Sequence, residues 1–350
     1  MAPRPKVQGE DIRAQVAKRL VELPPVPEGF DPLAQDDRQL AIYGIPPRPD
    51  ENADPAAHAL WQEAVAPPMR FLPVRIADIG FDFSHRLVPA NSTGAEARSG
   101  SRMVGSRNWS GALIMPERGR RFSGVMGSWR TSAHVAPMPL RDGDYRASVW
   151  IGLDGFFRRS KSLPQCGVTQ SIKVVGGAAQ PPEYMAWFQW WERDQLAPPI
   201  EFPNYPVKAN DRIICILSVN PAANTVNILI ANLNNYLALP ILYTGDNLGG
   251  WKVEGSTAEW VVERPSDLDH PEVMYPLPDY GQILFTGCVA TQSPDPPPTS
   301  PGSVPEGLPL ARPIRMRLLV ESTPPRSAII SAPKDNKVGT TSLRMTYRAP

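Results

Sequence analysis

The 350-residue chain lacks several features around which common classes of protein are built. Its three cysteines, Cys166, Cys215 and Cys288, are odd in number and far apart. They therefore form neither a complete disulfide framework nor the short ligand spacing of a zinc site. No apolar run approaches the roughly 18 residues that a membrane-spanning helix needs. We expect a soluble protein that does not depend on disulfides.

An excess of charge of one sign is also lacking, since 36 Lys and Arg residues balance 35 Asp and Glu residues. This balance gives no reason to expect nucleic acid or an anionic membrane as a partner. The N-terminal stretch contains no apolar core of a signal peptide, because Arg13, Lys18, Arg19 and Glu22 interrupt it. We expect a monomer that is cytoplasmic or exported by a non-classical route, and the compartment stays open.

The motifs of the familiar hydrolases are missing too. The four histidines are scattered and lie in no metal-ligand spacing such as H-E-x-x-H. Ser110 lacks the leading glycine of a nucleophile elbow, and Asp154-Gly155 lacks the Thr or Ser of an aspartic-peptidase loop. No glycine-rich loop is present that would hold a phosphate. We therefore expect no metal and no cofactor. The missing motifs also argue against a serine, cysteine, metallo or aspartic hydrolase.

Proline, in contrast, is abundant, with 42 residues against an ordinary usage of about 5%. This density favours loops and edge strands over long helices. Residues 1–100 are predicted to form an N-terminal extension of short helices that leans on the main body, followed by an exposed link at 88–107. The helices are expected at Glu10–Val21, from a capping box at Asp36 to Tyr43, and from Asp54 to Val65.

From Asn108 the apolar pattern alternates with a period of two, which is typical of strands. Many short strands without helices between them predict an all-β, antiparallel β-sandwich or barrel, which we place at residues 101–350. A proline-rich excursion is expected at 293–310, after which the tail returns to the same sheet. The predicted strands are Ser148–Leu153, Ser171–Val175, Tyr184–Trp191, Arg212–Val219, Thr225–Ala231, Thr257–Glu263, Gln282–Thr286, Ile314–Val320 and Ser342–Tyr347.

Five short motifs occur in a fixed order within this region. They are Asn108–Gly111, Trp150–Gly155, Gln165–Val168, Tyr184–Trp191 and Ala258–Glu263. Their order and spacing resemble those of the glutamic peptidases, the β-sandwich endopeptidases also called eqolisins or peptidase family G1. The resemblance covers about residues 106–290 and, more weakly, the tail. It implies a sandwich of the jelly-roll or concanavalin A-like type and a polypeptide substrate.

The resemblance also implies a catalytic dyad, with Gln165 and Glu259 at the two catalytic positions of the family. An ionised glutamate can take a proton from the attacking water and return it to the leaving amine. A neutral amide can donate a hydrogen bond to the developing oxyanion without competing for that proton. Substrate binding is expected from the apolar walls and polar groups of the cleft, which are Trp109, Trp150, Asp154, Trp187 and Gln189.

The residues alone leave other interpretations open. Glu259 alternates with Ala258 and Trp260, so by pattern it is a solvent-facing strand glutamate. Gln165 follows a proline in what reads as a loop. The chain would then be a catalytically inactive sandwich that binds peptide or carbohydrate through a tryptophan-lined groove, or a structural protein.

Departures from the family pattern concern the pH of action. Where the family usually has acidic residues, this chain has Met185, Gln189 and Thr169. Fewer carboxyl groups around the dyad reduce the penalty for working near neutrality, so we expect a pH optimum above the strongly acidic range. Residues 1–100 hold 11 Lys and Arg against 14 Asp and Glu, a net charge of −3. Such a segment is a poor electrostatic cap for an acidic site, which favours a docked extension over an inhibitory pro-segment.

Overall fold

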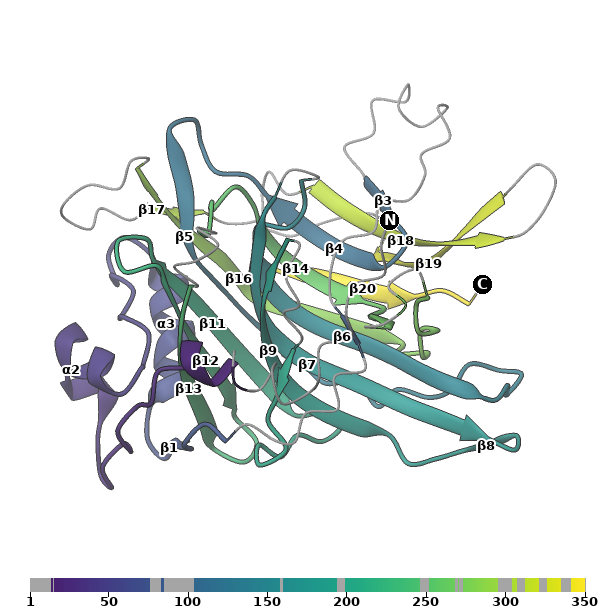
Figure 1. Ribbon diagram of the computed structural model, residues 1–350, viewed down its shortest axis with the longest axis horizontal. Helices are drawn as coiled ribbons and strands as arrows, with labels where there is room; N and C mark the ends of the chain where they lie inside the picture. Colours follow the sequence, from purple (N-terminus) through teal and green to yellow (C-terminus); the bar gives the residue numbers. More distant parts are fainter. Residues whose placement is uncertain are drawn as a thin grey trace.

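The structure is a computed structural model, and it describes the following parts of the chain. These are residues 14, 16–75, 83–84, 104–157, 160–193, 199–245, 252–267, 270, 273–294, 304–306, 312–320, 326–334 and 341–349. Two sheets packed on each other form the body, with short helices at one side (Figure 1). We call them the front sheet and the back sheet. No helix in the described part is long and apolar enough to cross a membrane.

The front sheet carries the candidate site. Its main strands run in the order β10 (Ile200–Glu201), β9 (Glu183–Glu192), β7 (Ser162–Val175), β6 (Gly143–Leu153), β14 (Ala258–Glu263), β4 (Trp109–Ile114) and β18 (Arg312–Val320). Beyond them pair β3 (Val104–Ser106), β19 (Arg326–Pro333) and β20 (Leu343–Tyr347), and β8 (Ala178–Ala179) pairs with the end of β7.

The back sheet contains β1 (Arg70–Phe71), β13 (Leu237–Thr244), β12 (Thr225–Asn232), β11 (Arg212–Asn220), β5 (Arg120–Arg130), β16 (Gln282–Pro294) and β17 (Val304–Glu306). Strand β16 belongs to both sheets. It pairs with β20 up to Phe285 and with β5 from Thr286 onward. The register shifts at this point, where Gly287 adopts φ +59°, a backbone conformation that favours glycine.

The main core lies between the two sheets and follows the two-residue alternation of the strands. Ala258, Trp260 and Val262 of β14 face it, as do alternate residues of β6, β7, β11 and β12. The Trp260 indole N–H donates to the Met126 carbonyl of the back sheet at 2.9 Å. Each buried aromatic or aliphatic side chain contributes about 1.5–3 kcal/mol through its removal from water. The predicted sandwich is therefore confirmed.

Short helices cover the outer face of the back sheet. They are η1 (Pro32–Ala34), α2 (Asp37–Ile42) and α3 (Pro55–Val65). The Asp36 and Asp54 carboxylates cap α2 and α3 by accepting from the N–H groups of Gln39 and Ala57 at 2.8 and 2.9 Å. Leu60, Trp61 and neighbouring apolar residues of α3 bury themselves against Ile214, Ile216, Leu229 and Ala231. The second and third predicted helices are confirmed; the first is helical at Ala14 and 16–19, and its remaining residues lie outside the described part.

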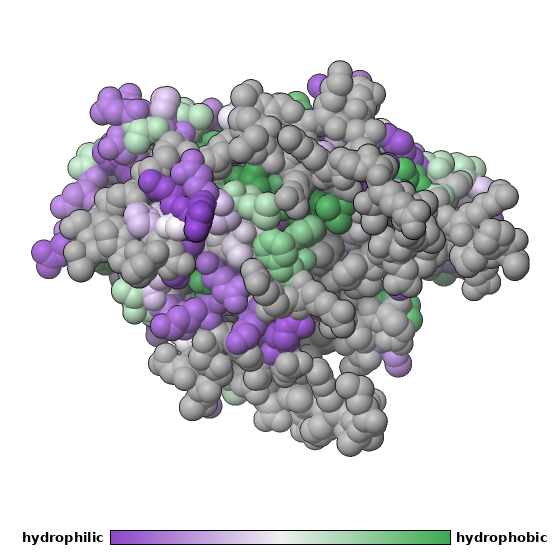
Figure 2. Space-filling view, turned by 90° about the horizontal axis from the view of Figure 1, so that it is seen from above, coloured by the Kyte–Doolittle hydropathy of each residue, from purple (hydrophilic) through white to green (hydrophobic). Residues whose placement is uncertain are grey.

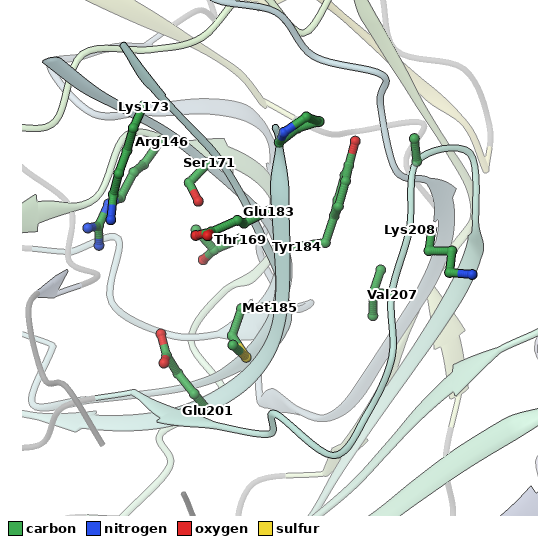
Figure 3. Close-up of a pocket in the computed structure, with 12 residues that line it drawn as sticks. Arg146, Thr169, Ser171, Lys173, Glu183, Tyr184, Met185, Glu201, Val207 and Lys208 are labelled. Carbon is green, nitrogen blue, oxygen red and sulfur yellow. The ribbon is translucent and has the colours of Figure 1, made fainter. Parts of the chain in front are cut away.

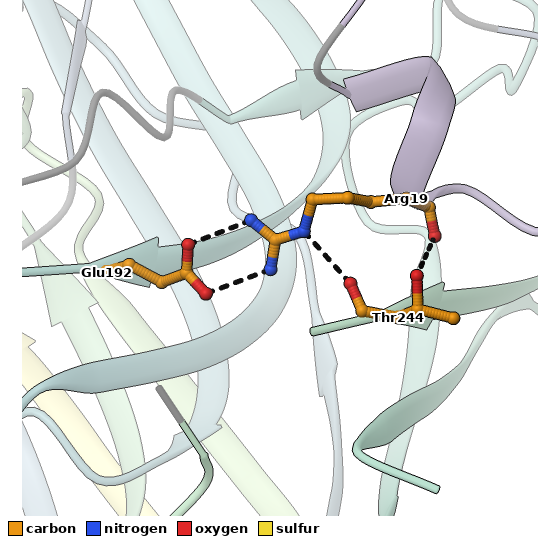
Figure 4. Close-up of polar contacts among 3 residues, drawn as sticks. All are labelled: Arg19, Glu192 and Thr244. Carbon is orange, nitrogen blue, oxygen red and sulfur yellow. Dashed lines mark hydrogen bonds and ion pairs between the residues drawn. The ribbon is translucent and has the colours of Figure 1, made fainter. Parts of the chain in front are cut away.

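The N-terminal segment also reaches the edge of the sandwich through Arg19. Its guanidinium donates to both oxygens of Glu192 at 2.8 and 3.0 Å and to the Thr244 carbonyl at 2.9 Å (Figure 4). It lies 5.3 and 4.7 Å from the ring centroids of Trp190 and Tyr243. Residues far apart in sequence are thereby joined at the end of β9 and β13.

Some sequence predictions need correction. The link predicted at 88–107 is wrong for 104–106, which form β3 beside β18, whereas 88–103 lie outside the described part. The strand predicted to start at Ser171 starts at Ser162, because Pro164 is tolerated inside β7. Strand β16 runs on to Pro294, so the predicted excursion begins within a strand. The longer strands β4, β5, β13 and β19 were not predicted.

Apolar surface gathers at the centre of the face seen in Figure 2, with hydrophilic residues beside it. The individual large apolar side chains that are most exposed, such as Met138 and Val175, lie apart in sequence on loops and strand ends. Single exposed apolar residues are normal in soluble domains and carry no functional signal.

Candidate functional site

Four polar or small residues form one row across the front sheet. Glu259 on β14 pairs with Gly152 on β6, Gly152 pairs with Gln165 on β7, and Gln165 pairs with Gln189 on β9. Paired residues on neighbouring strands point to the same face. This is the face opposite the main core, since Trp260, the next residue of β14, packs in that core. The structure thus brings both predicted dyad residues together on one face.

The glycine in this row leaves space between the two dyad side chains. Neighbouring strands lie roughly 4.8 Å apart, so the backbones of Glu259 and Gln165 are separated by about 10 Å with only Gly152 between them. A Cβ atom at position 152 would lie 3.0 Å from Gln165 Cβ, Pro164 O and Trp150 Cζ3. Gly152 therefore keeps open the gap in which a carboxylate and a carboxamide can face a common group.

Gln165 is held by its neighbour in the row. Its Nε2 donates to Oε1 of Gln189 at 2.8 Å, and both side chains are buried. Gln189 was predicted to bind substrate, and the structure places it where it orients the Gln165 carboxamide. Gln165 itself lies inside β7, so the loop position suggested by the preceding proline is wrong. A residue fixed within a strand is a more rigid support for a functional amide than a loop would be.

Glu259 is the most unusual group of the site. Its side chain is fully buried, and neither carboxylate oxygen makes a hydrogen bond of normal geometry to a described residue. Burial raises the pKa of Glu259 well above 4.5, the Thr257 hydroxyl acts in the opposite direction, and the charge of Asp154 raises it further. Buried carboxyl groups without partners are rare and costly, and they gather at functional sites. The simple interpretation as a solvent-facing strand glutamate is wrong.

Asp154 supports the chain segment that leads into β14. Its carboxylate accepts from the N–H groups of Glu254, Gly255 and Ser256 at 2.7, 3.0 and 2.6 Å, and from the Ser256 hydroxyl at 2.8 Å. Burial raises its pKa from 3.8 to about 6, although these four hydrogen bonds oppose the rise. Asp154 also adopts φ 69°, the left-handed conformation that Asp tolerates in turns. Its oxygens brace this loop, and a direct contact with substrate stays a prediction.

The three predicted cleft tryptophans lie on the same face as the dyad and pack in one cluster. Trp150 and Trp187 occupy the row next to the dyad, on either side of Gly167. A Cβ atom on Gly167 would lie 2.6 Å from the Cβ of Trp150, so glycine is required for this close approach. The ring centroids of Trp109 and Trp150 are 4.8 Å apart at an interplanar angle of 78°, an edge-to-face contact.

Sequence reasoning did not assign a role to the carboxylate that fixes this cluster. Glu263 accepts from Trp150 Nε1 at 2.8 Å and from Asn108 Nδ2 at 2.9 Å. Glu263 follows Glu259 by four residues in the same strand, so the period of two placed it on the same face and could have identified it. Asn108 was part of a quoted motif, yet its partner became visible only from the pairing of β14 with β4.

The dyad, Gln189 and the three tryptophans are all inaccessible to solvent in this structure. Among the described residues, no group of three or more His, Cys, Asp or Glu side chains is arranged to hold a metal ion. The row itself offers the buried carboxyl of Glu259 and the oriented carboxamide of Gln165, with apolar rings beside them.

Comparisons with known proteins point to a family. The profile of the Peptidase A4 family matches residues 107–304, just over half of the chain. A comparison with curated proteins gives no match.

The solved structures that match the chain include the following two, both at low sequence identity. Scytalido-glutamic peptidase with a transition state analog inhibitor is 15% identical, with 69% of this chain and 98% of that chain covered and a TM-score of 0.49. The enzymatically active domain of tailspike protein 2 from Bacteriophage CBA120 is 12% identical, with 59% and 28% covered and a TM-score of 0.28. Both likenesses are too distant to say anything about the site.

Proposed function

Because the chain belongs to the Peptidase A4 family, the eqolisins, we propose that it is a glutamic endopeptidase whose dyad is Gln165 and Glu259. The observation that carries the proposal is the row described above. A fully buried carboxyl without hydrogen bonds of normal geometry faces an oriented carboxamide across a glycine. This is the minimum set of groups needed to activate water and to stabilise an oxyanion.

In the proposed reaction the scissile peptide lies over Gly152, between the two side chains. Ionised Glu259 accepts a proton from a water molecule as the water oxygen bonds to the carbonyl carbon. The negative charge that develops on the carbonyl oxygen receives a hydrogen bond from Gln165 Nε2. When the C–N bond breaks, Glu259 returns the proton to the leaving nitrogen, and the products are a carboxylic acid and an amine.

Gln189 acts in this proposal as a positioning residue. Its Oε1 accepts from Gln165 Nε2, which fixes the plane of the amide before substrate arrives. The family usually has glutamate at this position, whose proton would be a further titrating group. A neutral glutamine provides the same acceptor without adding charge beside Glu259.

The same groups determine the expected pH dependence. Only the ionised form of Glu259 can accept a proton, and its pKa is raised well above 4.5. Activity should therefore increase with pH until Glu259 is ionised, which is consistent with the predicted optimum above the strongly acidic range. Thr169, another position where an acid is usual, shares a hydrogen bond of 2.7 Å with Ser148.

Cleavage of an unfolded protein across about pH 2 to 8 tests the proposal. The parent is compared with Glu259→Gln, which removes the base, and with Gln165→Ala, which removes the oxyanion donor. We expect no measurable turnover from the first and a loss on the order of 10²–10³ in kcat from the second. If neither variant alters proteolysis, the chain is a binding or structural sandwich, and a peptide and glycan binding screen would separate those two.

A further inference from the structure

An open pocket of about 630 Å³ lies over β6, β7 and β9 (Figure 3). The charged residues that line it carry both signs, and they are Arg146, Lys173, Lys208, Glu183 and Glu201. Mixed charge of this kind favours no single class of ligand. The inner face of β6 and β7 carries a more specific arrangement, in which two cysteine side chains meet across the core.

The two thiols belong to Cys166 of β7 in the front sheet and Cys215 of β11 in the back sheet. Both side chains are fully buried in the main core, and both are free thiols in this structure. The Cys166 side chain shares a hydrogen bond with the Cys215 thiol. The two residues lie 49 positions apart in the sequence, so their pairing was not predicted from it.

The strand registers place these side chains opposite each other independently of that hydrogen bond. In the front sheet Cys166 pairs with Ile151 of β6, and in the back sheet Cys215 pairs with Gly127 of β5. Ile151 lies over Gly127, because a Cβ atom at position 127 would be 3.4 Å from its Cγ2. Cα atoms of β7 and β11 also come within 8 Å of each other. The strand next to β6 therefore lies over the strand next to β5, with Cys166 over Cys215.

The two sheets approach closely at this point. In Ile151 the Cγ2 atom is about 2.5 Å from Cα, and a Cβ atom at position 127 would be about 1.5 Å from the Cα of Gly127. The two Cα atoms therefore lie within about 7.5 Å of each other, compared with roughly 10 Å between packed sheets in general. Disulfides join cysteines whose Cα atoms are about 4.4–6.8 Å apart. Gly127 thus brings the sheets close to the spacing that a disulfide bridges.

We propose that Cys166 and Cys215 form a disulfide that links the two sheets when the chain folds in an oxidising environment. The thiolate of one cysteine attacks a small-molecule disulfide, such as oxidised glutathione, and releases one glutathione thiolate. The second cysteine attacks the resulting mixed disulfide and releases the other. One S–S bond forms in the protein, one S–S bond breaks in the oxidant, and two protons pass from the cysteines to the two glutathione thiolates.

The closed core limits when this exchange takes place. Burial raises the pKa of the Cys215 thiol well above 9.0, and the hydrogen bond and charge of Cys166 raise it further. The thiolate is the reacting form of cysteine, and neither side chain is accessible to an oxidant in the folded chain. The bond therefore forms during folding, before the sheets close. Once formed, it resists a reductant until the chain unfolds.

The link also bears on the candidate site. Cys166 directly follows Gln165 in β7, so the disulfide ties the strand that carries this carboxamide to the back sheet. Cys288, the third cysteine, is also buried and stays a free thiol. The proposal does not depend on the proposed peptidase activity, because the same bond forms in an active or an inactive sandwich.

Thiol counting on the full chain tests the disulfide. The chain is produced once in the oxidising bacterial periplasm and once in a reducing cytoplasm. Thiols are titrated after unfolding in guanidinium chloride. Of the three cysteines, we expect only Cys288 to react in the periplasmic protein, whereas all three react in the cytoplasmic protein. Mass spectrometry of unreduced peptides should show the peptide of Cys166 joined to that of Cys215, and dithiothreitol should open the bond only when urea is added.

The variants Cys166→Ala, Cys215→Ala and Cys288→Ala assign the bond. Only Cys288→Ala, the matched control, should keep it, with no free thiol left in the periplasmic protein. The Tm of the linked parent should be about 4–8 °C above that of the cytoplasmic parent, because the bond restricts the unfolded chain. This difference should persist in Cys288→Ala and disappear in Cys215→Ala.

Three reactive thiols in a periplasmic chain that is folded by circular dichroism would overturn the proposal. A bond that includes Cys288, or glutathione left on Cys166 or Cys215, would do the same. A chain that does not accumulate in the periplasm is unfolded in urea with dithiothreitol and refolded with reduced and oxidised glutathione, and the same count is made. Peptide cleavage by a chain with three thiols refutes the disulfide and leaves the dyad, whereas a linked chain without cleavage refutes the dyad and leaves the disulfide.

Discussion

Arg19 offers a sharp test of how the N-terminal segment is held on the sandwich. Its side chain is 15% exposed and that of its partner Glu192 only 3%, so the ion pair is almost removed from water. Replacement by methionine, Arg19→Met, keeps most of the aliphatic length and removes the guanidinium. The buried Glu192 carboxylate then loses the two hydrogen bonds and the positive charge that Arg19 supplies.

The expected loss follows from this burial. Removing one partner of a buried ion pair costs about 3–5 kcal/mol, because the other charge stays desolvated. The partial exposure of Arg19 places the value at the lower end, about 3 kcal/mol. At about 2 °C for each kcal/mol in a protein of this size, Tm should fall by about 6 °C. Arg19→Lys keeps the charge but cannot form two parallel hydrogen bonds, so its Tm should lie between that of the parent and that of Arg19→Met.

Thermal unfolding of the parent, the two Arg19 variants, Glu192→Gln and the double variant Arg19→Met/Glu192→Gln measures the effect. The double variant should be more stable than the sum of the single changes predicts, by about 1–3 kcal/mol, because the residues are in direct contact. Additive changes, or a shift of Tm below about 1 °C for Arg19→Met, would refute the reasoning that this contact holds the segment.

Three further outcomes are expected. The acid limb of the pH dependence of kcat/KM should lie at lower pH in Asp154→Asn than in the parent, because the charge of Asp154 raises the pKa of Glu259; an unchanged limb contradicts this coupling. Gly152→Ala should reduce kcat at least about 10-fold while costing about 1–3 kcal/mol of stability, because its Cβ would crowd Gln165 and Trp150; Gly143→Ala, at the exposed start of the same strand where a Cβ meets only ordinary contacts, is the control, and full activity of Gly152→Ala refutes the need for the gap. We also propose that residues 1–100 stay attached, so mass spectrometry after incubation at low pH should show the intact chain, and clean loss of about a hundred residues would support a pro-segment instead.

The stability of the parent should itself depend on pH through Asp154. Its folded-state pKa is about 6 against 3.8 for the free group. The folded protein therefore binds more protons than the unfolded chain between these values, and the stabilisation present below about pH 4 is lost as the pH rises through about 6. A shift of two pKa units corresponds to about 3 kcal/mol. Urea unfolding at pH 4 and pH 7 measures this loss together with that of Glu259, whose raised pKa acts in the same direction. The loss should be smaller in Asp154→Asn, and an equal loss in this variant and the parent would contradict the contribution of Asp154.

Nine strands of the main body were predicted because alternation is a local property, whereas β4, β5, β13 and β19 were missed. Trp260 and Glu259 were assigned to opposite faces from the period of two alone, and the structure confirms this. What the pattern could not supply is the environment of the outer face. Glu259 reads as solvent-facing because one strand carries no information about what covers it, yet its side chain is fully buried.

The pairing and register of the strands were the second feature that could not be predicted from the sequence. The gap at Gly152 depends on two registers. In β14 against β6, Glu259 pairs with Gly152 across 107 positions of sequence, and in β7 against β6, Gln165 pairs with Gly152 across 13 positions. Because glycine has no side chain, the alternation of apolar and polar residues gave no indication of the role of Gly152. The proline before Gln165 favoured a loop by its local preference, and tertiary pairing with β6 and β9 overrode that preference.

The most direct measurement of the central claim compares two buried glutamates of the same strand and face. Glu259 has no hydrogen bond of normal geometry, whereas Glu263 accepts from Asn108 and Trp150. The kcat/KM of the parent, Glu259→Gln and Glu263→Gln is measured with one quenched-fluorescence peptide at the pH of highest parent activity, after circular dichroism has shown that all three are folded. We predict that Glu259→Gln has no measurable turnover and that Glu263→Gln stays within about 10-fold of the parent, since it only positions Trp150. Turnover by Glu259→Gln equal to that of Glu263→Gln would contradict the account.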